Sequence, residues 1–126
     1  MAVIYSTATK TARMNAVVAQ IDAGAAAGKL EIGTAGMATV LATFTLNDPC
    51  GTVSGAVLTL SGFPKSDTAA DNTGTAAAAR IRDSNNVDII TGLTVGLSGT
   101  DIVLDSVNFT TGQTVTINSA TITHAA

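Results

Sequence analysis

Tryptophan is absent from this chain of 126 residues, and aromatic residues of every kind make up only 3% of it. A core without large rings must be built from valine, isoleucine, leucine and alanine. These side chains are small, and burial contributes only about 25 cal/mol per Å² of apolar surface. We therefore expect modest stability of the isolated chain and support from neighbouring subunits.

Charged residues are also scarce, at 12% of the sequence, which is about half the share in a typical domain. The net charge is −3, and no basic residue follows Arg82. Nucleic-acid binding needs clustered lysine and arginine, so the composition argues against a nucleic-acid partner. Sparse charge is typical of a chain packed into an assembly rather than of a free monomer, and we expect a homo-oligomer.

Only one cysteine, Cys50, and one histidine, His124, are present. A single cysteine excludes a disulfide within the chain. We expect Cys50 to be a small, half-buried turn residue, with a disulfide to another subunit as the alternative. A catalytic thiol needs a nearby base, and we expect His124 to be a surface residue. No nucleophile elbow or phosphate-binding loop is present either, so we predict no enzyme and no cofactor.

The loop "SDTAADNTGT" concentrates Asp67, Asp71 and Asn72. Oxygen ligands of this kind can bind Ca²⁺, but the D-x-D-x-D-G ligand pattern is missing. We therefore expect a polar turn and no metal. Asp101 and Asp105 lie four residues apart, on one face of a regular strand. We expect them to be solvated or paired across a subunit contact.

No apolar run approaches the ~20 residues that cross a bilayer. The segment "MAVIYSTATK" has no basic region followed by an apolar core, as a secretion signal would. We therefore expect a protein made in the cytoplasm, without a membrane partner.

The range 8–26 is predicted to be the only helix, preceding a β-rich remainder. Its apolar residues are spaced as on one face of a helix: Met14, Val17, Val18, Ile21 and Ala25. We expect Thr7 or Thr9 to cap its start. We expect Gly24 or Gly28 to end it. Its apolar face is expected to cover one side or an open end of the sheet core, with docking on another subunit as the alternative.

Short strands are predicted from Lys29 onward, separated by turns rich in Gly, Asn and Asp. The fold class is therefore mainly β: a single domain over 1–126, forming an antiparallel sandwich or small jelly-roll-like barrel with one N-terminal helix. The alanine-rich 75–83 is interpreted as a strand that forms a hairpin with 87–97 around "SNN". Further strands are expected within 30–33, 37–46 and 55–62.

A closing hairpin is predicted over 101–124, with strands 101–109 and 113–124 joined by "TTG". In both strands the apolar residues change parity midway, near Asp105 and near Asn118. A strand does this through a β-bulge or by passing into another environment. We predict long, bent strands, and different contacts for the parts before and after Asn118.

Several segments resemble small virion structural proteins of tailed bacteriophages and prophages. The similar segments are "L-x-I" at 30–32, "TVLATFTLNDP" at 39–49, "DTAADNTGTA" at 67–76, "GLSGTDIVLDS" at 96–106 and "GQTVTINSATITH" at 112–124. This chain has "AAAAR" at 76–80, where such proteins often carry an aromatic residue before the arginine.

The resemblance implies a structural role in the virion, with the major capsid protein or other virion proteins as partners. The leading hypothesis is a capsid decoration or minor capsid subunit that stabilises the head. A neck, tail or fibre component is the alternative. A host-glycan-binding module is less favoured, because such sites present Trp or Tyr platforms and this chain has only Tyr5. The candidate interface residues are Met14, Val17 and Ile21 of the helix and Val115, Ile117 and Ile122 of the closing hairpin.

Overall fold

A computed structural model describes residues 4–123 and confirms a mainly β chain with one N-terminal helix and antiparallel sheets. One sheet has four strands in the order β2-β1-β7-β8. Their bounds are β1 Lys29–Gly33, β2 Val40–Thr45, β7 Ala78–Arg82 and β8 Asp88–Leu93. The short 3-10 helix η1, Ala35–Met37, connects β1 to β2.

A six-stranded sheet has the order β3-β4-β12-β10-β9, with β5 also paired to β12. Every pairing in it is antiparallel except that of β9 with β10. Its strands are β3 Gly51–Ser54, β4 Val57–Leu60, β5 Lys65–Asp67, β9 Val95–Gly96, β10 Ile102–Leu104 and β12 Val115–Thr123. A third pairing joins β6 Gly74–Thr75 to β11 Asn108–Phe109.

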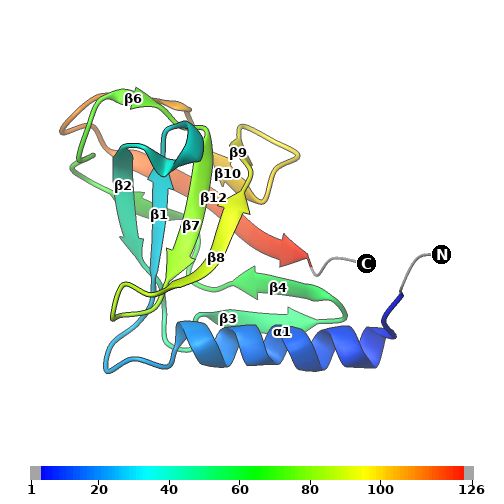
Figure 1. Cartoon of the computed structure of the whole chain (residues 1–126). Helices are drawn as coiled ribbons and strands as arrows, with labels where there is room; N and C mark the ends of the chain where they lie inside the picture. The colour runs from blue at the N-terminus through cyan, green and yellow to red at the C-terminus, as the bar shows by residue number, and fades with distance from the viewer. Residues whose placement is uncertain (1–3, 124–126) are drawn as a thin grey trace.

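The core lies between the sheets, where alternate residues of each strand point inward. In Figure 1, β12 crosses behind β1 and β7, while α1 (Thr7–Ile21) lies along β3 and β4. Fully buried aliphatic side chains from both sheets include Leu30, Ile32, Ile81, Leu58, Ile102 and Ile117. The four-stranded sheet and α1 thus cover the same core. As predicted, α1 packs against the sheet of its own chain, at β3 and β4.

Helix α1 is shorter than the predicted 8–26. Its N-cap is Ser6, whose hydroxyl accepts the Thr9 N–H at 3.2 Å, rather than Thr7 or Thr9. It ends at Ile21 with Asp22 as C-cap, before either predicted glycine. The Asp22 carboxylate accepts the Cys50 N–H at 3.2 Å, so the end of the helix is tied to the residue that precedes β3.

The alanine-rich segment is a strand, as predicted, because Ala79 and Ile81 alternate inward. The turn into β8 forms around the "SNN" segment. The Asp83 carboxylate accepts the N–H groups of Asn85 and Val87 at 2.9 and 3.0 Å, and Asn86 adopts a φ of 64°. Asn tolerates this left-handed conformation, which closes the hairpin.

The closing hairpin is only partly as predicted. The expected strand 101–109 is broken, because β10 pairs with β12 whereas β11 pairs with β6. Phe109 at the end of β11 is buried, and the chain leaves the sheet to place it in the core. On the other arm, β12 begins at Val115 rather than at residue 113, and His124 lies outside the described residues.

The predicted change of parity in β12 is confirmed. Leu104 pairs with Ile117 and Val103 with Ser119, so Asn118 is an extra residue in β12. This β-bulge keeps the apolar residues of both halves on the inner face. Before the bulge β12 pairs with β5, and after it with β4. The two halves therefore have different neighbours, both supplied by the chain itself.

Candidate functional site

The acidic loop is a structural turn. The Asp67 carboxylate accepts the N–H groups of Thr43 at 3.3 Å and Ala69 at 3.0 Å. The Asn72 amide donates to the Val40 carbonyl at 2.8 Å. Within residues 4–123, no group of three or more His, Cys, Asp or Glu side chains is placed to hold a metal ion. The loop's polar groups instead fasten it along β2.

Cys50 is completely buried, more so than the half-buried position expected. Burial, and to a lesser extent the nearby Asp22 carboxylate, raises the pKa of the Cys50 thiol to about 12. The side chain is therefore a protonated, unreactive core group at neutral pH. A disulfide to another subunit requires a thiol at the surface, and this one is covered.

Asp101 and Asp105 do not share a strand face, contrary to prediction. Asp101 precedes β10, and its carboxylate accepts the N–H and the hydroxyl of Thr94 at 3.0 and 3.1 Å. Asp105 is exposed, just beyond the end of β10. The Asp101 carboxylate is thus engaged inside the chain rather than held ready for a partner.

The six candidate interface residues lie in or against the chain's own core. Met14 and Ile21 of α1 are buried, and Val17 is packed against the core. The buried residues of β12 include Val115, Ile117 and Ile122. The chain covers most of their apolar surface, and their contact with a second subunit stays a prediction.

The outer face of the six-stranded sheet presents mainly hydroxyl groups. Pairing aligns Thr52 with Thr59 and Thr59 with Thr121, so these three form a row across β3, β4 and β12. The Ser66 and Thr116 hydroxyls meet at 3.0 Å. We call this the hydroxyl face and define it by Thr52, Ser54, Thr59, Ser66, Thr116, Ser119, Thr121 and Thr123. None of these residues is charged, and most are exposed.

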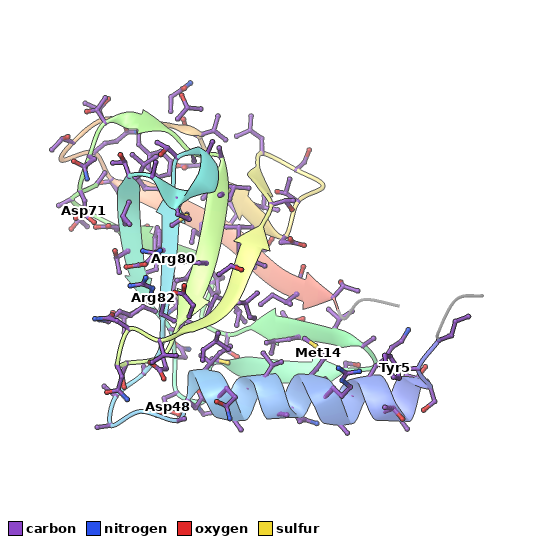
Figure 2. The ribbon with its side chains drawn as sticks, in the orientation of Figure 1. Tyr5, Met14, Asp48, Asp71, Arg80 and Arg82 are labelled. Carbon is purple, nitrogen blue, oxygen red and sulfur yellow. The ribbon has the colours of Figure 1, made fainter. Side chains whose placement is uncertain are left out.

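The outer face of the four-stranded sheet carries charged side chains, among them Arg80 and Arg82, which are labelled in Figure 2. We call it the charged face; it holds Lys29, Glu31, Arg80, Arg82 and Asp88. Arg80 Nε lies 2.6 Å from Glu31 Oε1, and Arg82 Nε lies 2.7 Å from Asp88 Oδ1. The chain therefore separates its surface into a face of paired ions and a face without ions.

The two faces differ in the cost of burying them against a partner. Removing an ion from water costs several kcal/mol even after relaxation. Burying a hydroxyl costs about 1–3 kcal/mol, and a hydrogen bond to the partner offsets this. Each hydroxyl can both donate and accept, so many arrangements of partner groups satisfy it. Of the two faces, the hydroxyl face therefore costs less free energy to bury against a partner.

Both edges of the four-stranded sheet are protected against pairing with another strand. At β2, the loop bonds from Asp67 and Asn72 occupy part of the free edge, and the Asp71 N–H donates to Leu41 at 2.7 Å. At β8, the register with β7 shifts twice. Loop cover and bulges are both known ways of blocking edge-to-edge association. Contacts of this sheet with partners are thus expected through its face rather than its edges.

A groove of about 360 Å³ lies between β2 and β5, lined by residues 43–45 and 65–68. Hydroxyl groups and Lys65 dominate it, and the Lys65 ammonium donates to the Asn47 side chain at 2.7 Å. The groove is a polar recess, and the Asp67 carboxylate that also lines it accepts the Thr43 N–H.

Sequence reasoning missed the hydroxyl face, although a signal was available. Thr and Ser occupy the outward parity of β3, β4 and β12, and no Lys or Arg follows Arg82 in the sequence. Register was needed to show that Thr52, Thr59 and Thr121 are neighbours. Tyr5, the only tyrosine, has the Arg13 guanidinium carbon 4.6 Å from its ring centroid. One side of the Tyr5 ring is thereby covered by the Arg13 guanidinium.

Comparison with protein-family models, with curated proteins and with solved structures finds no match for this chain. Among residues 4–123, no helix is long and apolar enough to cross a membrane.

Proposed function

We propose that this chain is a non-enzymatic structural subunit of a bacteriophage particle, and specifically a decoration or minor capsid protein that stabilises the head. The hydroxyl face is the observation that carries the proposal, because it is broad, uncharged and left uncovered by the other residues that the structure describes. The resemblance of several segments to small virion proteins supports the same role. The partner is the major capsid protein, with further copies of this chain as neighbours.

The mechanism is mass action on the assembled state. A subunit that binds the assembled lattice but not the free capsid protein stabilises the lattice by about 2.7 kcal/mol per site at a hundredfold excess over its Kd. Repetition over many sites multiplies this effect without any chemical step. A neutral face favours such binding, because its contact energy changes little with ionic strength.

The test compares particles that carry the protein with particles that lack it. We expect particles without the protein to release DNA at lower temperature and after transfer to low salt. Adding back purified protein should restore resistance. Adding back the Thr59→Lys variant should fail, because it buries an ammonium in the hydroxyl face. The matched control is Gln20→Lys, which adds the same charge on the exposed side of α1. Unchanged resistance of particles without the protein would refute the stabilising role.

Copy number separates this proposal from its alternative. Hundreds of copies per particle agree with a decoration lattice, whereas a few to a few dozen indicate a neck, tail or fibre component. Labelling the protein on intact particles and imaging them gives its position independently. Binding of the purified protein to host glycans would favour the third hypothesis, a receptor-binding module.

A further inference from the structure

A hollow of about 400 Å³ lies on the charged face, between η1 and β8. We propose that it binds an aromatic side chain presented by a partner protein. The volume is within the usual range for ligand sites. Its lining comes from η1, β7 and β8, through Gly36, Met37, Ala78, Arg80, Thr91 and Gly92. This inference concerns the face opposite the hydroxyl face and does not depend on the proposed function.

The hollow is built into the backbone. Gly36, Met37 and Gly92 all have left-handed φ values, of 68°, 58° and 73°. A Cβ at Gly36 or Gly92 would meet nothing within 4 Å, so both glycines leave open space at the rim. Thr34 holds η1 in place, because its carbonyl accepts the Met37 N–H at 2.8 Å and its hydroxyl accepts the Thr39 N–H at 3.0 Å. A ligand can therefore enter without a rearrangement of the chain.

The two charged groups at the hollow are already paired. Arg80 Nε bonds Glu31, and the Arg80 side chain is only 18% exposed. Asp88, which also lines the hollow, bonds Arg82. A charged ligand would have to compete with these pairs, whereas an uncharged ring leaves both intact. The pairing thus favours a neutral, flat group.

The remaining lining favours an aromatic ring over an aliphatic group. A guanidinium attracts an aromatic face through the ring quadrupole. The thioether of methionine also makes favourable contacts with aromatic rings. Arg80 and Met37 both line this hollow, and the other lining residues include Ala78 and two glycines, which take up little space.

The chain cannot supply the ring itself. Of its four aromatic side chains, Phe44 and Phe109 are buried, Phe63 packs against the core, and Tyr5 lies beside Arg13. The ring must therefore come from another molecule. A protein partner fits best, because the surrounding charged face gives area for the backbone and flanking side chains that hold the ring in place.

The experiment uses the purified chain and N-acetyl-tryptophanamide as the probe. The chain has no tryptophan, so probe fluorescence anisotropy reports binding without background. In ¹⁵N spectra, we expect saturable shifts at the amides of Met37, Ala78 and Gly92. N-acetyl-leucinamide should bind roughly threefold more weakly or worse, because it lacks the ring. Equal binding of the two probes, shifts centred elsewhere, or no saturable shift up to the probe's solubility limit would overturn the proposal.

Variants that fill the hollow locate the site. Ala78→Leu should abolish the tryptophanamide shifts, while Thr45→Leu, on the same face of the same sheet but at its other edge, should leave them unchanged. If Ala78→Leu does not fold, Thr91→Leu fills the hollow from the exposed side of β8. Retained binding in a folded filling variant contradicts the assignment.

Discussion

Arg80 of β7 and Glu31 of β1 stand directly opposite each other, and their side chains meet through a 2.6 Å contact of Nε with Oε1. Glu31 also lies 3.6 Å from Arg82 Nε, so one carboxylate serves two guanidinium groups. Both partners of the closer pair are less than one fifth exposed. The pair therefore contributes more than an ordinary surface ion pair.

Removing this shared carboxylate is expected to destabilise the chain. Glu31→Gln should lower the free energy of unfolding by about 1–3 kcal/mol, because it leaves a half-buried guanidinium without its anion. Urea unfolding followed by circular dichroism measures the change. Asp88→Asn is the control, because the Asp88 side chain is 48% exposed and should cost less than about 1 kcal/mol. Equal losses would contradict the special role of Glu31.

The β-bulge predicts an unusual tolerance to deletion. Deleting Asn118 restores strict alternation in β12, so Val115, Ile117, Ala120 and Ile122 all stay on the inner face. We expect this chain to unfold cooperatively, at a lower urea midpoint because the bend is lost. Deleting Thr121 instead turns Ile122 outward, since a one-residue slip reverses the face, and should abolish cooperative unfolding. If the two deletions prove equally damaging, the bulge assignment is wrong.

Because Cys50 is buried, we expect the free energy of unfolding to fall at high pH. Its folded pKa of about 12 lies above the ordinary value of 9.0. Between these values the unfolded chain loses the thiol proton while the folded chain keeps it. The contribution is therefore complete below pH 9 and decreases by about 1.4 kcal/mol per pH unit above it. The pH dependence of urea unfolding should lose this component in Cys50→Ala.

Thiol labelling checks the burial of Cys50 independently. At pH 8 the folded chain should react with a disulfide reagent only as fast as it opens, and the guanidinium-unfolded chain should react at once. Rapid labelling of the folded chain would mean that the thiol is accessible.

The Asp67 carboxylate predicts protection of the β2 edge. Asp67→Ala should remove the partner of the Thr43 N–H, cost about 0.5–1.5 kcal/mol and increase association of partly unfolded chains on heating. Light scattering during a thermal ramp measures this. Asp71→Ala is the control, since Asp71 contacts β2 through its backbone N–H, which the substitution keeps. Equal scattering from both variants would argue against edge protection by the carboxylate.

The sequence by itself determined the fold class and the position of the main elements. Period-two alternation at residues such as Leu30, Ile32, Ala79 and Ile81 is a local property, and burial of one face follows from it. The parity change at Asn118 could also be predicted, because a bulge shifts the alternation of apolar and polar residues by one position. The start and end of α1 were less predictable, since Ser6 and Asp22 act through specific hydrogen bonds.

Only the tertiary structure decided how the surface is divided. β11 pairs with β6, and Phe109 at its end is buried in the core. No local sequence pattern predicts this pairing. The hydroxyl face exists because strand register places Thr52, Thr59 and Thr121 in one row. Register depends on contacts between segments far apart in sequence. The composition shows that the chain has few charged residues, and the fold determines which face has no charged side chain.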